Sequence, residues 1–178
     1  MKKHEKFIAY FIFIVVLMSI NEWFVHKFIM HNSELSIGRE HISHHKETND
    51  DMSLKKNMKN LDANKYRGTA FSYETSAYIF IVALIQILIS WYFCFNANYI
   101  IPILLTVFFS VYQGVVWNSV HTKMHGMPNV DCDIGYPSII PPKYLSFLEQ
   151  NHTKHHHSKG TKYFNVTLPI ADYIFGTV

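Results

Sequence analysis

The sequence predicts an all-α integral membrane protein with about three transmembrane helices, folded as a single domain over residues 1–178. Three observations carry this prediction. The 178-residue chain is 49% hydrophobic and 16% aromatic, which is high for a soluble chain of this length. It has no charged residue over the 46 positions from Thr75 to Val120. It also contains twelve histidines, and ten of them fall in four short clusters beside the apolar segments.

The charge-free stretch divides into two helices. Ala77–Phe95 and Tyr99–Trp117 are each 19 residues long, and Asn96–Asn98 separates them. A helix of 19 residues spans roughly 28 Å, which is about the thickness of the hydrocarbon core of a bilayer. A soluble helix usually keeps one polar face, and neither segment has one. We therefore predict a transmembrane hairpin over residues 77–117.

A shorter apolar run, Phe7–Ile20, follows three N-terminal lysines. It is similar to a signal peptide, but no pair of small residues resembling a cleavage site follows it. Apolar residues resume at Trp23, so we predict a first membrane span over residues 7–25. The three tryptophans of the chain lie near predicted helix ends, as interfacial aromatic residues do.

Three spans place residues 26–76 and 118–178 on the same side of the membrane. These two segments hold 13 Lys and Arg residues against 3 before the first span, so the positive-inside rule makes their side the cytosolic one. The basic residues form no aromatic-interleaved patch, so we expect no nucleic-acid partner. Cys94 and Cys132 are too few for a disulfide framework or a cysteine-rich metal site.

The clustered histidines all lie on the predicted cytosolic side, whereas His4 lies on the other side. The clusters are H-x4-H (His26, His31), H-x2-HH (His41, His44, His45), H-x3-H (His121, His125) and a second H-x2-HH (His152, His155, His156). Positions i, i+3 and i+4 share one face of a helix, so each H-x2-HH cluster points three imidazoles one way. His157 points away from His152 by the same geometry.

One such cluster alone is usually a solvated or core feature, but four that face one compartment predict a metal site. The two histidines of H-x4-H do not share one helical face so closely. Their spacing suits a helix end, or ligands that reach two different metals. Ten imidazoles exceed what one ion accepts, so two metals with about five histidines each are expected. Imidazole suits iron, zinc and copper, and the spacing does not choose among them.

In this order, and around a transmembrane hairpin, the four clusters resemble those of the fatty acid hydroxylase / sterol desaturase superfamily of membrane oxygenases. The resemblance runs from about His26 to the end of the chain. HKFIMH, at 26–31, is similar to the first histidine box of carotenoid hydroxylases, and NSVHTKMH, at 118–125, to a box of plasmalogen-forming lipid desaturases. ADYIFGT, at 171–177, is similar to the W-D-x-x-F-G-T ending of the superfamily, with Ala171 in place of the aromatic residue.

The resemblance implies an oxidoreductase of lipid biosynthesis with a non-haem dimetal centre, two irons with zinc as the alternative. The ten clustered histidines would be its ligands, with no further catalytic side chain. It would use O2 to hydroxylate or desaturate a C–H bond of a fatty acid, sterol or related lipid. The implied partners are the lipid substrate, the membrane, and an electron donor such as cytochrome b5 or ferredoxin with its reductase. In a eukaryote the implied location is the endoplasmic reticulum membrane.

A second hypothesis is a metal-binding membrane protein without catalysis, such as a transporter or a buffer. A transporter should place ligands near mid-membrane, and the predicted hairpin contains no histidine.

Ligating histidines also need acceptors for their second ring nitrogen, and nearby polar residues are candidates: Glu22, Asn118, Asn151 and Asp172. Finally, Pro142 and Gly160 predict the start and stop of a helix that covers the site. The polar segment 46–68 fits a helix on the membrane surface or a flexible insertion, and 126–140 fits a loop.

Overall fold

The computed structural model describes residues 2–53, 55, 73–125 and 140–178, and every regular element of more than one residue in these ranges is helical. The all-α prediction is therefore confirmed. Most of the polar segment 46–68 and nearly all of the predicted loop 126–140 lie outside the described residues. The helices are α1 (Lys3–Phe24), η1 (Val25–Met30), α2 (Ser36–Glu47), α3 (Tyr73–Phe95), α4 (Ile100–Val115), η5 (Val116–His121), α5 (Thr122–Met124), α6 (Pro142–His157) and α7 (Ile170–Ile174).

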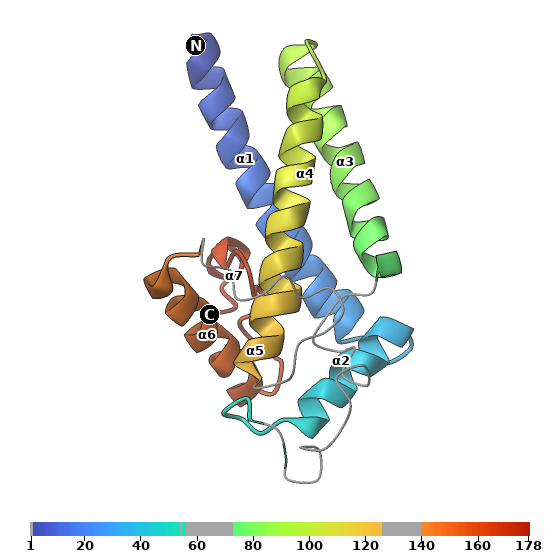
Figure 1. The fold of residues 1–178 in the computed structure, drawn as a ribbon, viewed down its shortest axis with the longest axis vertical. Helices are drawn as coiled ribbons and strands as arrows, with labels where there is room; N and C mark the ends of the chain where they lie inside the picture. The colour runs from blue at the N-terminus through green and yellow to red at the C-terminus, as the bar shows by residue number, and fades with distance from the viewer. Residues whose placement is uncertain (1, 54, 56–72, 126–139) are drawn as a thin grey trace.

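Three long helical runs are apolar enough to cross a membrane, as predicted. They are Lys3–Met30, Ser76–Phe95 and Ile100–Asn118. The first is longer than the expected 7–25, because α1 continues without a break into the π-helix η1. Figure 1 shows the three runs side by side at one end of the molecule, with α2, α5 and α6 gathered at the other.

The long helices pack through one narrow apolar seam and leave the rest of their surface exposed. Tyr10, Ile14 and Met18 of α1 are buried against Ile87 and Trp91 of α3. The Tyr10 hydroxyl donates to the Ile87 carbonyl over 2.9 Å. Side chains on the outer faces are large and apolar, and about half of each is exposed: Ile8, Ile12 and Phe13 on α1, Ile81, Val82 and Ile85 on α3, and Leu104, Val107 and Phe108 on α4. An outward apolar surface with a packed seam is the pattern of a bundle whose solvent is lipid.

A tight turn closes the hairpin between α3 and α4, where the sequence predicts it. Asn96 adopts a positive φ of 44°, which asparagine tolerates better than most residues. The Asn98 side chain then accepts a hydrogen bond from the Ile100 amide over 2.9 Å, which gives the first amide of α4 a partner.

Gly38 lets α2 cross closely under the end of the first span. A Cβ atom on Gly38 would lie 1.8 Å from the Asn32 carbonyl oxygen and 2.9 Å from that of Ile29. Only a residue without a side chain fits this approach. The crossing brings the histidine face of α2 beneath η1.

Candidate metal centre

The four histidine clusters meet at one end of the three long helices. His26 lies in η1 and His31 directly after it, whereas His121 ends η5. The two H-x2-HH clusters lie on α2 and α6, which flank this end of the bundle in Figure 1. Eight of the ten clustered histidines are no more than 4% exposed, and His31 and His45 are half-buried. The fold thus gathers these residues as the sequence predicts.

The histidines divide into two groups whose ring nitrogens converge. In each group one nitrogen per residue lies within 4.8 Å of all the others. The first group is His26, His31, His41, His45 and His155, and the second is His44, His121, His125 and His152. His156 adjoins the second group, because its Nε2 lies 3.2 Å from that of His152. The two groups thus hold five and four histidines, with His156 beside the second, and a count of five ligands for each ion stays a prediction.

Each H-x2-HH cluster contributes to both groups. His41 and His45, at i and i+4 on α2, belong to the first group, and His44 belongs to the second. On α6 the assignment is reversed, because His152 belongs to the second group and His155 to the first. Each group thus combines residues from both helices, and this sharing is not visible in the spacing of either cluster alone.

Both histidines of the H-x4-H cluster belong to one group. The expectation that they reach two different metals is therefore wrong, whereas a position at a helix end agrees with the structure. His26 and His31 both belong to the first group, and their rings stack with centroids 5.3 Å apart. The reason is the π-helix between them, since its wider turn, with hydrogen bonds from i to i+5, brings residues five apart nearer to one face than an α-helix does. A second π-helix, η5, ends at His121.

The contacts around His152 identify these groups as more than hydrogen-bonded histidines. Its Nε2 atom lies 2.8, 3.0 and 3.2 Å from the Nε2 atoms of His121, His125 and His156. A ring nitrogen carries either one hydrogen or one lone pair, so it can satisfy only one such contact. If metal–nitrogen bonds are about 2.1 Å long, as they are for zinc, two nitrogens at right angles around the ion lie roughly 3.0 Å apart. The observed spacings fit a shared cation.

Backbone carbonyls fix which nitrogen faces each group. The Nδ1–H groups of His125 and His155 donate to the carbonyls of Met52, over 3.0 Å, and Lys162, over 2.6 Å. His26 Nδ1 donates in the same way to the Phe164 carbonyl. Because a carbonyl can only accept, Nδ1 of each ring must carry the hydrogen, which leaves a lone pair on Nε2. These three Nε2 lone pairs point into the groups, as metal ligation requires.

The acceptors that the sequence proposed have other partners. Glu22 accepts hydrogen bonds from the amides of Val166 and Thr167, at 2.8 and 2.7 Å. Asp172 accepts from the amides of Phe164 and Asn165, at 2.9 and 2.8 Å. Both carboxylates therefore act on the histidines indirectly. They hold the C-terminal segment in place, and this segment presents the Phe164 carbonyl to His26. Asn118 and Asn151 are buried near the site.

Burial keeps the imidazoles neutral, which is the form that binds metal. Burial, reinforced by the neighbouring imidazoles, lowers the pKa values of five of them well below the usual value, namely those of His41, His44, His125, His152 and His155. Burial also lowers the pKa of His31 to about 4 and that of His45 and His156 to about 2. At neutral pH these rings hold no extra proton for an incoming metal to displace.

His44 supplies the clearest test of whether a cation fits. Both of its ring nitrogens are buried and have no hydrogen-bond partner, and the same holds for Nε2 of His31 and Nδ1 of His152. A buried polar atom without a partner is costly, so native proteins rarely keep one. An ion in each group would coordinate His44 and His31 through these atoms. The residues present therefore fit two metal ions, whose identity the donor set leaves open.

Gly160 gives His31 its place in the first group. It adopts a φ of +73° just after α6, and a Cβ atom there would lie 2.4 Å from Cε1 of His31. Besides the predicted helix stop, Gly160 thus has a second role. Because it has no side chain, the ring of His31, which follows the first span, can approach it closely.

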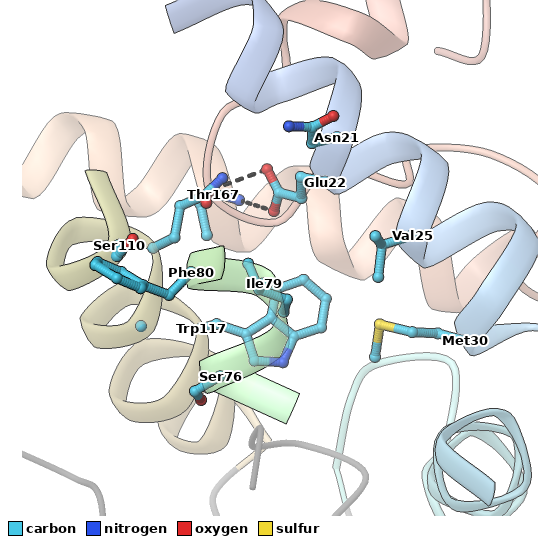
Figure 2. Close-up of a pocket in the computed structure, with 12 residues that line it drawn as sticks. Asn21, Glu22, Val25, Met30, Ser76, Ile79, Phe80, Ser110, Trp117 and Thr167 are labelled. Atoms are coloured by element: carbon cyan, nitrogen blue, oxygen red, sulfur yellow. Dashed lines mark hydrogen bonds between the residues drawn. The ribbon is translucent and has the colours of Figure 1, made fainter. Parts of the chain in front are cut away.

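An apolar cavity lies between the membrane helices, with Trp117 between it and the histidines. It has a volume of about 80 Å³ and lies between α1, α3 and α4, as Figure 2 shows. Met30 and Trp117 line its end, and the Trp117 ring contacts the rings of His26 and His121, with centroids 5.4 and 5.0 Å apart. Trp117 therefore separates the cavity from one histidine of each group. The sequence placed Trp117 only at a helix end, and no pattern in it signalled this contact.

These features define a class of protein: a helical membrane protein with two adjoining histidine groups that could each hold a metal ion, and an apolar cavity beside them. The chain belongs to the fatty acid hydroxylase family, whose model matches residues 11–177. The family resemblance drawn from the histidine clusters is thereby confirmed. Comparison with curated proteins and with solved structures finds no match for this chain.

Proposed function

We propose that this protein is a membrane-bound dimetal oxidoreductase that uses O2 to hydroxylate or desaturate a C–H bond of a lipid. The observation that carries the proposal is the contact of Trp117 with both histidine groups on one side and the apolar cavity on the other. A lipid chain in this cavity would end beside both candidate metal sites. Family membership supports the same class of reaction.

The ten clustered histidines would hold the two ions. In the proposed reaction the ions, when bound, supply the redox chemistry that activates O2, and zinc cannot do this because it has no second oxidation state. Among the redox-active metals that imidazole suits, we propose iron, which the family resemblance implies. The chain itself keeps the imidazoles neutral, orients three of them through the carbonyls of Met52, Lys162 and Phe164, and excludes water by burying the groups.

The balance of the reaction requires an external reductant. Hydroxylation converts R–H, O2, two electrons and two protons to R–OH and water, and desaturation forms a C=C bond and two waters from the same inputs. We propose an electron carrier such as cytochrome b5 or ferredoxin, with its reductase, as the source. The half-buried His31 and His45 line a pocket with Lys46 and Lys159, and this pocket would face the carrier on the cytosolic side.

The cavity favours a hydrocarbon segment as the part of the substrate that reacts. The surface of its wall is mostly apolar, with Val25, Ile79 and Phe80 among the lining residues. Its volume of about 80 Å³ holds only a few carbon atoms, so the rest of the lipid would extend between the helices toward the bilayer. The reacting class would then be a fatty acid, sterol or related lipid with an accessible chain.

Filling the cavity tests the proposal without touching a histidine. A Cβ atom on Gly114, which lines the cavity, meets no atom within 4 Å, so Gly114→Leu should fold and occupy the space. The wild-type protein, expressed with an electron donor, should carry about two irons per chain and generate a hydroxylated or desaturated lipid in its host membrane. Gly114→Leu should keep the iron and lose the product.

The matched control is Val111→Leu, which enlarges an exposed side chain on the outer face of α4 and should retain both iron and product. Full product formation by Gly114→Leu would contradict the proposed substrate cavity. Bound metal without any lipid product in the wild-type protein, even after reconstitution with iron, would favour the non-catalytic metal-binding alternative.

A further inference from the structure

A second apolar surface lies at the histidine end of the first span, outside the candidate metal centre. Five side chains form it, and each is between 46 and 59% exposed: Phe24, Phe28, Tyr173, Ile174 and Phe175. We call these five residues the terminal aromatic patch. Large exposed apolar patches on proteins usually mark a surface that meets a membrane or a partner.

Trp23 joins the two halves of the patch into one surface. Its ring lies 5.7 Å from that of Phe28 on η1 and 4.4 Å from that of Phe175, which follows α7. Its indole Nε1–H donates to the Thr177 hydroxyl over 3.0 Å, which fixes the C-terminal residues against the first span. Residues about 150 positions apart in sequence therefore present their rings together.

The patch lies on the same apolar run as the exposed residues of α1. Ile8, Ile12 and Phe13 are exposed in the first half of this helix, residues 14–23 are buried or half-buried, and Phe24 and Phe28 are exposed again at its end. Both phenylalanines lie within the run Lys3–Met30 that is apolar enough to cross a membrane. The occupant of the patch is thus most simply the lipid that already covers α1.

Polar groups at the edge of the patch indicate how deep it lies. The Lys27 ammonium sits 4.5 Å above the Trp23 ring and 5.4 Å from that of Phe28, so a cation–π contact holds a positive charge at the edge of the patch. Tyrosine, tryptophan and lysine together mark the boundary between acyl chains and headgroups. A patch at the centre of the bilayer would not carry a lysine.

The opposite face of α7 leads to the histidines. Ala171 and Asp172 are buried, and the Ala171 amide donates to the Ser19 hydroxyl of α1 over 2.8 Å, so α7 packs on the first span (Figure 1). Asp172 holds the amides of Phe164 and Asn165, and the Phe164 carbonyl accepts from His26. One short helix therefore separates the exposed patch from the candidate metal centre.

We propose that the terminal aromatic patch is a membrane-interface anchor, in which α7 lies at the boundary of acyl chains and headgroups beside the end of the first span. The anchor sets the depth of the histidine groups just below the bilayer surface. This inference does not depend on the proposed enzymatic function, because it concerns only how the protein sits in lipid.

Spin-label accessibility in phosphatidylcholine nanodiscs tests the anchor on the full chain. Single cysteines at Ile174 and Phe28, in a Cys94→Ser, Cys132→Ser background, would carry a nitroxide, and Tyr173→Cys provides a second position on α7. Collisions with O2, which concentrates in acyl chains, are compared with collisions with a water-soluble nickel complex. Val107→Cys on the outer face of α4 serves as the buried-in-lipid reference, and Ser146→Cys on the exposed face of α6 as the aqueous one.

The expected ratio of O2 to nickel collisions at 174, 173 and 28 lies between the two references and exceeds that at 146 severalfold. A ratio equal to that at 146 would place the patch in water and overturn the proposal. Low collision rates with both reagents would also overturn it, because they would show that protein, such as a second copy of the chain, covers the patch.

Discussion

Cε1 of His31 lies only 2.4 Å from the point where a Cβ atom on Gly160 would stand. Gly160→Ala should therefore displace His31 from the first group and lower its metal occupancy, which elemental mass spectrometry would measure. The positive φ adds a cost of about 1 kcal/mol for any residue with a side chain. Gly176→Ala separates the two effects, because Gly176 also has a positive φ of 64° but no atom within 4 Å of its Cβ position. Equal metal contents in the two variants would contradict the role of the contact.

His152 and His45 provide the most direct test of the histidine groups as ligands. Each side chain contacts two or more other imidazoles through Nε2. His152→Ala or His45→Ala should remove metal and activity, while the protein still inserts into the membrane. His157→Ala is the matched control, since this side chain is 80% exposed and should be near neutral. A His152 variant with full metal content and turnover would refute the assignment.

Glu22 should matter for the position of the C-terminal segment and not as a ligand. Its carboxylate accepts hydrogen bonds from Val166, Thr167 and Leu168 amides, from the Thr167 hydroxyl and from the Asn165 side chain. Glu22→Ala leaves several donors without a partner and should lower the free energy of unfolding by about 3 kcal/mol or more. Thermal unfolding in detergent would measure this loss. Glu34→Gln, which changes an exposed carboxylate, should have no comparable effect.

The metal-free protein should lose stability as the pH falls below 6.5. An unfolded histidine has a pKa of about 6.5, whereas burial lowers the folded pKa of His31 to about 4 and that of His45 to about 2. Below pH 6.5 the unfolded chain therefore binds more protons than the folded one, and the stability contribution is complete only above that pH. After chelation, Tm at about pH 5 should lie clearly below Tm at about pH 7.5. His31→Ala should reduce the dependence only by the share of one histidine, because the other buried histidines keep their lowered pKa values. A Tm that does not change with pH would contradict the prediction.

The sequence predicts the helical class and the gathering of the histidines because both depend on composition and on spacing along single helices. The three spans follow from apolar length, and the faces of α2 and α6 follow from the spacing of His41 and His45 or of His152 and His156. These features are local. Nothing beyond the residues of one helix is needed to deduce them.

The arrangement of the histidines within the site depends on long-range packing, so it cannot be predicted from the residues of single helices. The π-helical turn between His26 and His31 cannot be deduced from the apolar run that contains it. Carbonyls of Met52 and Lys162 orient His125 and His155, and any residue type would supply a carbonyl, so the sequence carries no signal for them. Glu22 stood out as a polar residue near the site, but only the fold shows that its partners lie near the opposite end of the chain.

The exchange of histidines between α2 and α6 has a consequence for how the centre would assemble. With the proposed ligands, either ion alone would cross-link the same two helices, because each group draws on both. Binding of the first ion would include most of the entropy loss of fixing α2 against α6. The second ion would then bind to ligands that are already ordered. Loading should thus be positively cooperative, with apo and doubly loaded chains populated in preference to the half-loaded form.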